Sequence, residues 1–169
     1  MSVFTYIASD YPLAEVENPH VKTLSVNQAL EMGVKVHDFL LDPSFDRDKP
    51  NVILWADDNN NFGEISIKAF SREDLLYDIY SEKKYLAQLE WEYTECRAKK
   101  LLEYIKDHLT EADEIELWNT WLGIDSNRLK PKTKIHRIPI EQLTCLDLEK
   151  LLNKNTFDFP ECIVVSKTK

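Results

Sequence analysis

Short segments of β-branched and aromatic residues, several with apolar and polar positions in alternation, predict the strands of this protein. Such residues suit the pleated, half-buried surface of a sheet. The expected strands are residues 3–8, 21–24, 52–56, 62–70, 135–140 and 162–165. We expect 52–56 and 62–70 to form a hairpin, because the polar turn 57–61 joins them. Pro139 favours an edge position for the strand that contains it.

Capping signals predict two short helices. A capping box joins two residues three positions apart. The side chain of each accepts a hydrogen bond from the backbone N–H of the other. Ser25 and Gln28 have this spacing, and Met32-Gly33 supplies a matching end, so we expect a helix over 26–32. A second short helix is expected from Thr144 to Leu152.

The central stretch from Glu64 to Leu122 contains neither glycine nor proline, and apolar residues recur there every three or four positions. This pattern predicts one long helix over 72–109, with a capping signal at 71–74. Such a helix would be about 57 Å long, which exceeds the diameter of a compact domain of this size. We therefore expect it to break near 81–84, to project, or to pack against a second copy.

Residues 110–122 fit either a helix or a strand, and their Thr, Trp and Ile residues favour a strand. The order of expected elements then predicts an α+β protein. Its sheet would be mixed or mainly antiparallel, with one long central helix and two short helices packed on one face. The whole chain, residues 1–169, is expected to form a single globular domain, since its length suits one core.

The composition argues against several functional classes. Only three glycines occur, at 33, 63 and 123, and they are too isolated to build a phosphate-binding loop. A net charge of −9 opposes sequence-independent binding to nucleic acid or to an anionic membrane. No apolar run approaches the roughly 20 residues of a membrane span, and the N-terminus lacks a signal-peptide pattern. Three widely spaced cysteines suit a reducing compartment, so we expect a cytoplasmic protein.

The polar segment after residue 56 is the candidate metal site. Asp57, Asn59 and Asn61 match the first three ligand positions of a calcium loop. The match then fails, because Phe62 replaces the required glycine and Lys68 the bidentate glutamate. Asp and Asn are also common in turns, which we take as the better interpretation. We therefore expect no metal and no cofactor.

The four histidines are scattered, and none has metal-ligand spacing to another histidine or to a cysteine. Residues at the ends of strands often carry chemistry. An alternative hypothesis is therefore a small enzyme or ligand-binding protein, with a site near His37, His136 and Arg137.

A basic segment interrupts this acidic chain. Five cations fall within ten residues: Arg128, Lys130, Lys132, Lys134 and Arg137. The segment is a candidate site for phosphate or for an acidic partner. The competing explanation is internal charge balance against the acidic run Glu111–Glu116.

The central region is rich in aromatic residues, and on one helix Trp91 and Tyr93 would point about 200° apart. One of them would then lie off the core face, where aromatic residues often form interfaces. Our leading hypothesis is a non-catalytic protein that binds a protein partner or a second copy of itself through this helix. Neither a nucleic acid nor a membrane is expected as a partner.

Overall fold

The computed structural model describes residues 2–74, 79–122, 132–152 and 160–167. The chain divides into two compact units: a large unit of Met1–Glu17 and Ile65–Lys169, and a small unit of Asn18–Glu64. Each unit is described by itself. The expectation that they act as a single domain stays a prediction.

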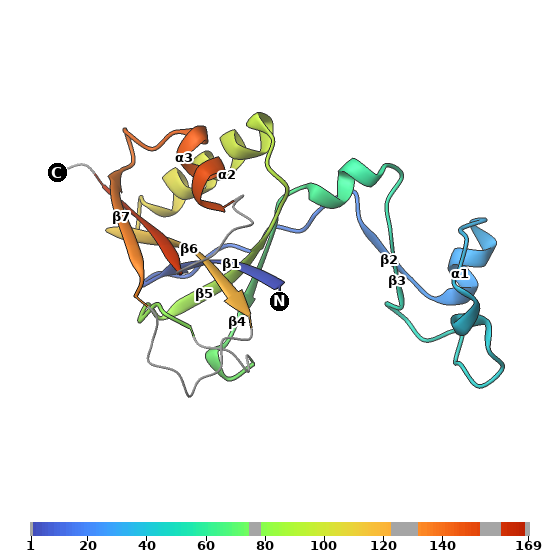
Figure 1. Ribbon diagram of the computed structural model, residues 1–169. Helices are drawn as coiled ribbons and strands as arrows, with labels where there is room; N and C mark the ends of the chain where they lie inside the picture. Colours follow the sequence, from blue (N-terminus) through green and yellow to red (C-terminus); the bar gives the residue numbers. More distant parts are fainter. Residues whose placement is uncertain (1, 75–78, 123–131, 153–159, 168–169) are drawn as a thin grey trace. The chain divides into compact units, whose positions relative to one another are not determined.

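A six-stranded mixed sheet forms the centre of the large unit (Figure 1). The strands, in spatial order, are β4 (Ser66–Phe70), β5 (Tyr85–Glu90), β1 (Ser2–Ser9), β6 (Glu114–Leu122), β8 (Glu161–Ser166) and β7 (Lys134–Pro139). All neighbouring strands are antiparallel except β7 and β8, which are parallel. The α+β prediction is confirmed, and β7 is an edge strand, as Pro139 predicted.

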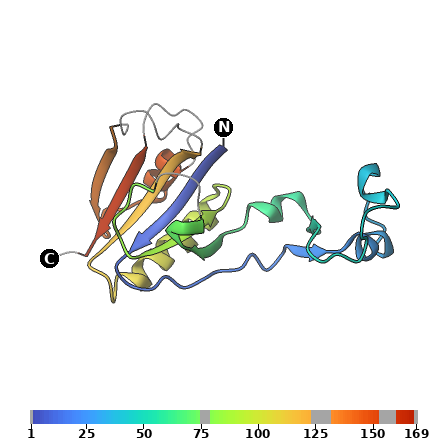
Figure 2. The same ribbon diagram turned by 90° about the horizontal axis from the view of Figure 1, so that it is seen from below.

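Helices α2 (Glu95–His108) and α3 (Cys145–Leu152) cover one face of the sheet, and Figure 2 views the sheet with both helices behind it. Because side chains alternate along a strand, Ile7 and Leu117 join the core beneath the helices. Tyr6 and Trp118 lie in a second buried cluster. Both faces of the sheet are therefore buried at its centre. Among the described residues, no helix is long and apolar enough to cross a membrane.

The prediction of one long helix over 72–109 is wrong. The 3-10 turn η3 (Arg72–Asp74) comes first, strand β5 occupies 85–90, and α2 begins only after its N-cap, Thr94. Leu86 and Leu89, which fit a helical repeat, are buried in clusters on opposite faces of the sheet. The lack of glycine and proline removes helix breakers, but it does not stop a sequence from pairing as a strand.

The predicted hairpin of 52–56 with 62–70 is also wrong. Strand β3 (Ile53–Trp55) pairs with β2 (Lys22–Leu24) in a separate two-stranded sheet, whereas β4 pairs with β5. Between β3 and β4 lies the 3-10 turn η2 (Asn59–Gly63), capped by the Asp58 side chain. The prediction that the polar segment forms a turn was correct. The prediction that its two flanking strands pair with each other was not.

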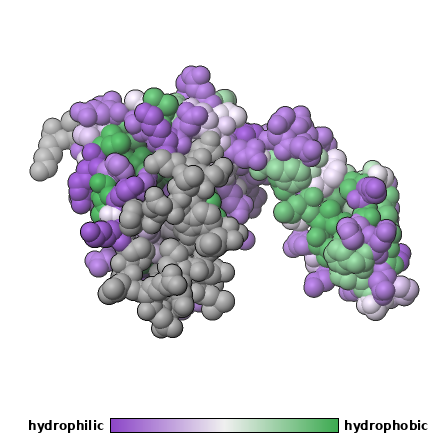
Figure 3. Space-filling model, in the orientation of Figure 1, coloured by the Kyte–Doolittle hydropathy of each residue, from purple (hydrophilic) through white to green (hydrophobic). Residues whose placement is uncertain are grey.

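The small unit contains β2, β3, the short helix α1 (Val26–Glu31), and the turns η1 (Asp38–Leu41) and η2. The predicted capping box is present: the Ser25 side chain accepts from the N–H of Gln28, and the Gln28 side chain accepts from the N–H of Ser25. Gly33 follows the helix with a φ of 73°. The small unit also carries exposed apolar side chains, and Figure 3 shows apolar surface over it. They are Leu30, Met32, Phe39, Leu54 and Phe62.

Candidate protein-binding edge formed by β7 and α3

Strand β7 lies at one edge of the six-stranded sheet, and among the described residues no strand pairs with its outer side. Residues 132–137 are all exposed, and Ile135 keeps 51% of its surface accessible. An edge strand leaves a row of backbone N–H and C=O groups available to another chain. The candidate site begins with this row.

The pairing of β7 with β8 determines which backbone groups point outward. Lys134 N–H donates to Pro160 at 2.9 Å, and Ile140 N–H donates to Ser166 at 3.0 Å. With the parallel register of His136 opposite Ile163, the even-numbered residues of β7 bond inward to β8. The N–H and C=O groups of Ile135 and Arg137 therefore point outward. Pro139 has no N–H to offer.

Helix α3 lies beside β7, because the chain turns back after Ile140 and the helix starts at a local cap. The Thr144 hydroxyl accepts from the N–H of Asp147, and the Asp147 carboxylate accepts from the N–H and hydroxyl of Thr144. This arrangement ties down the first turn of α3. Buried Leu148, Leu151 and Leu152 hold the helix against the sheet.

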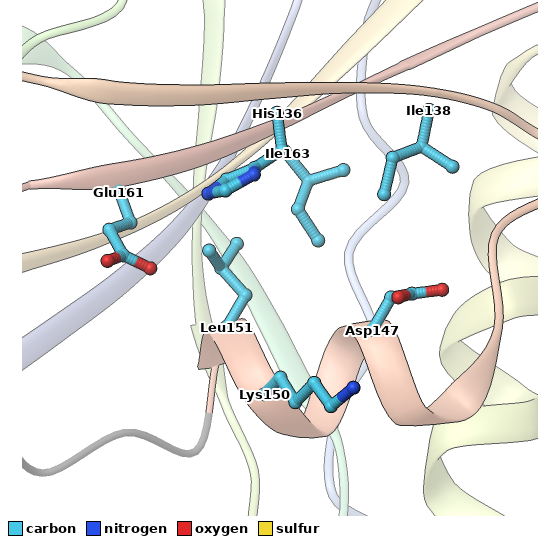
Figure 4. Close-up of a pocket in the computed structure, with 7 residues that line it drawn as sticks. All are labelled: His136, Ile138, Asp147, Lys150, Leu151, Glu161 and Ile163. Atoms are coloured by element: carbon cyan, nitrogen blue, oxygen red, sulfur yellow. The ribbon is translucent and has the colours of Figure 1, made fainter.

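A pocket of about 200 Å³ lies between α3 and strands β7 and β8 (Figure 4). Its lining residues are His136, Ile138, Asp147, Lys150, Leu151, Glu161 and Ile163. In Figure 4 the apolar side chains of Ile138, Ile163 and Leu151 lie between the polar residues. His136 points towards the end of the pocket where Glu161 lies, while Lys150 and Asp147 come from α3. The pocket thus has an apolar centre and charged margins. We call the outer side of β7 together with this pocket the β7–α3 groove.

The acidic groups of the groove already have partners. Glu161 forms an ion pair with Lys134 at 3.2 Å, and Asp147 is engaged in the helix cap. The side chains of His136 and Lys150 form no hydrogen bond or ion pair with any described residue. The groove therefore presents donor groups more readily than acceptors.

The sequence-predicted basic segment contributes directly to this groove. Lys132 is exposed, and Lys134 belongs to β7. Arg128 and Lys130 lie outside the described residues. The competing explanation of internal charge balance holds for one residue, because Arg137 forms a 3.3 Å ion pair with Glu114.

The residues of the alternative catalytic site do not share one surface of β7. His136 lines the groove, whereas Arg137 points to the opposite face, as alternation along a strand requires. His37 belongs to the small unit, where it caps η1 and its ring lies 5.0 Å from that of Phe39. A joint site of His37 with His136 and Arg137 stays a prediction.

Trp91 and Tyr93 lie between β5 and α2 and not on a helix. Their rings meet edge to face at 6.0 Å, and both half-buried side chains pack against the core beneath the helices. The argument that a helix separates the two residues by about 200° therefore does not apply. Their role in an interface stays a prediction.

Asp57 is exposed, and among the described residues no group of three or more His, Cys, Asp or Glu side chains could hold a metal ion. The neighbouring Asp58 accepts from the N–H of Asn60 at 2.8 Å, as a turn residue does.

Sequence reasoning missed the α3 side of the groove, namely Asp147, Lys150 and Leu151. The Thr144-x-x-Asp147 cap was a usable signal for the helix. The sequence contained no signal for the position of α3 beside β7, because that position depends on the pairing of β7 with β8. Comparisons of the chain with protein-family models, with curated proteins and with solved structures find no match.

Proposed function

We propose that the protein is a non-catalytic binding protein whose contact surface for another protein is the β7–α3 groove. The observation that carries this proposal is the outer edge of β7, where exposed residues and outward backbone groups adjoin an apolar pocket. Strand edges of this kind bind other chains through main-chain hydrogen bonds, while adjacent pockets select side chains.

The charge of the edge favours an acidic partner. Lys132, Lys134 and Arg137 lie along it in a chain whose net charge is −9. Nucleic acid is a poorer fit, because it carries a negative charge at every phosphate, and the overall field of the protein repels it more strongly than a short segment with one or two carboxylates. The described residues that line the pocket include no Ser, Thr or Cys nucleophile, so a binding role suits the groove better than covalent catalysis. A cytoplasmic location is part of the proposal and is supported by the free cysteines.

Charge reversal tests the proposal. In the edge variant, exposed Lys132 and Lys150 are both replaced by Glu; the control variant carries Lys35→Glu and Lys68→Glu, which change the net charge equally at exposed sites elsewhere. Tagged wild-type and variant proteins are used to capture partners from an extract of the source cells, and the captured proteins are quantified by mass spectrometry. We expect at least one acidic partner to be retained by the wild type and the control and lost by the edge variant. Equal capture by all three proteins would refute the proposal.

A further inference from the structure

We infer that the partner supplies an extended segment that pairs with β7 as a seventh strand, with an apolar side chain in the pocket and acidic residues beside it. This inference rests on the proposed function and specifies how the β7–α3 groove binds. It follows from four features of the groove: the spacing of its backbone groups, the alternation of its side chains, the walls of its pocket and its charge.

The backbone of β7 is ready to accept one more strand. Ile135 and Arg137 each direct an N–H and a C=O outward, because the alternate, even-numbered residues of β7 bond to β8. An added strand that runs in either direction can bond to both residues. Pro139 cannot donate, so the pairing is strongest from Lys132 to Arg137 and ends towards the turn before α3.

Alternation then determines which side chain of the added strand meets the pocket. His136 and Ile138 face α3, whereas Ile135 and Arg137 face away from it. A partner residue directly opposite His136 therefore also turns its side chain towards α3. Its two neighbours turn to the other face, beside the exposed side chains of Ile135 and Arg137.

The walls of the pocket select an apolar group at the position opposite His136. Ile138, Ile163 and Leu151 line the pocket on the α3 side of β7 (Figure 4), and its volume of about 200 Å³ is several times that of one water molecule. An aliphatic side chain of the partner would displace water from these three residues. Burial of apolar surface supplies affinity that main-chain bonds alone do not.

Charge complementarity identifies the partner as an acidic segment and argues against a second copy of β7. Lys132 lies just before the strand and Lys134 begins it, while exposed Lys150 borders the pocket. Two β7 strands side by side would gather the cations of both copies along one seam, and neither strand carries an Asp or Glu to offset them. An Asp or Glu two positions from the apolar residue turns to the same face and meets them favourably.

The probe for this inference is a phage library of random eight-residue peptides, selected on the whole protein and counter-selected on the Lys132→Glu, Lys150→Glu variant. We expect enriched peptides to carry an apolar residue with an Asp or Glu two positions away from it. A synthetic peptide of the enriched sequence is then titrated by fluorescence anisotropy. Peptides without this pattern would overturn the inferred partner class.

Two matched variants test strand addition. Ile135→Pro removes an outward N–H that takes no part in the sheet, and proline is tolerated on edge strands; Ile135→Val keeps that N–H. We expect the proline variant to bind the peptide about tenfold more weakly, the effect of one lost main-chain hydrogen bond, and the valine variant to bind nearly as the wild type does. Equal binding by both variants would overturn strand addition.

Amide hydrogen exchange on the wild type gives a readout that does not depend on how the variants fold. Peptide binding should slow exchange at Ile135 and Arg137, while His136 and Ile138, already bonded to β8, change little. Peptide binding without this alternating protection would overturn strand addition and leave the proposed binding function standing. If the selection yields no peptide while the edge variant still loses its cellular partner, only the inference fails. If the edge variant also keeps that partner, both fail.

Discussion

Cys162 lies on the face of the sheet opposite α2 and α3, fully buried beside Tyr6 and Trp118. Burial raises the pKa of its thiol above the ordinary value, and the Glu116 carboxylate adds to the increase. Burial likewise raises the pKa of the Tyr6 hydroxyl, although that hydroxyl accepts a hydrogen bond from the N–H of Tyr80. Both groups are therefore held in their neutral forms.

These raised pKa values predict that the protein loses stability in alkaline solution. Above about pH 9 the thiol of Cys162 ionises in the unfolded chain but stays protonated in the folded one, so the unfolded state binds fewer protons and becomes relatively more favourable. Tyr6 adds to the loss above about pH 10. Urea denaturation from pH 7 to 10.5 should show the free energy of unfolding falling over this range. In Cys162→Ala the fall should be shallower; an unchanged slope would contradict the assignment to this thiol.

The three cysteines show what residue type alone can tell. Their odd number predicted free thiols, and all three are free. Buried packing is typical of a free cysteine, yet only Cys162 is buried, whereas Cys96 is exposed on α2. Exposure depends on which side of an element faces the core, and a residue's identity does not specify it.

At the scale of elements, the capping box of α1 has a measurable role. Ser25→Ala removes the hydroxyl that accepts from Gln28 N–H, and loss of an N-cap typically costs about 1 kcal/mol. We expect amide exchange within Val26–Glu31 to become about fivefold faster, while amides of β1 and β6 are unaffected. Ser25→Thr keeps a capping hydroxyl and should stay close to the wild type. Equal exchange in all three proteins would show that tertiary contacts alone hold α1.

The two short capped helices were predicted well, whereas strand β5 was not. The box at Ser25 and the cap at Thr144 involve residues three positions apart, so they are complete in the sequence. Strand β5 has no such signal, because it is held by long-range pairing with β1 and β4. Its leucines fit a helical repeat as well as a strand, and only its partners decide between them.

At the scale of the whole molecule, the small unit is an insertion whose ends leave the large unit side by side. Val16 and Ile67 exchange two backbone hydrogen bonds, at 2.9 and 2.8 Å. The segment before the insertion is also held by α2: Tyr104 donates to the C=O of Ala14, and the N–H of Ala14 donates to His108. The large unit thus secures both ends of the insertion with its own contacts.

Excision of the small unit should therefore leave the large unit folded. Replacing residues 18–64 by Asn-Gly leaves Asn-Gly-Ile65 as a three-residue loop between Glu17 and Ser66, a length that suits a connection between antiparallel segments. We expect a cooperative thermal transition and unchanged amide resonances for β1 and β6. The excised protein should also keep its affinity for the peptide that binds the β7–α3 groove. A chain that no longer folds would show that the large unit depends on residues 18–64.

Local patterns in the chain were enough to predict the α+β class, the short capped helices, the edge position of β7 and the basic segment that leads into it. Each follows from residues close together in the chain: a cap, a proline, or an alternation of apolar and polar positions. Tertiary structure alone decided that residues 85–90 form a central strand, that β3 and β4 have different partners, and that α3 forms a pocket beside β7. These depend on hydrogen bonds and apolar contacts between residues far apart in the chain, whose free energy exists only once the sheet is assembled.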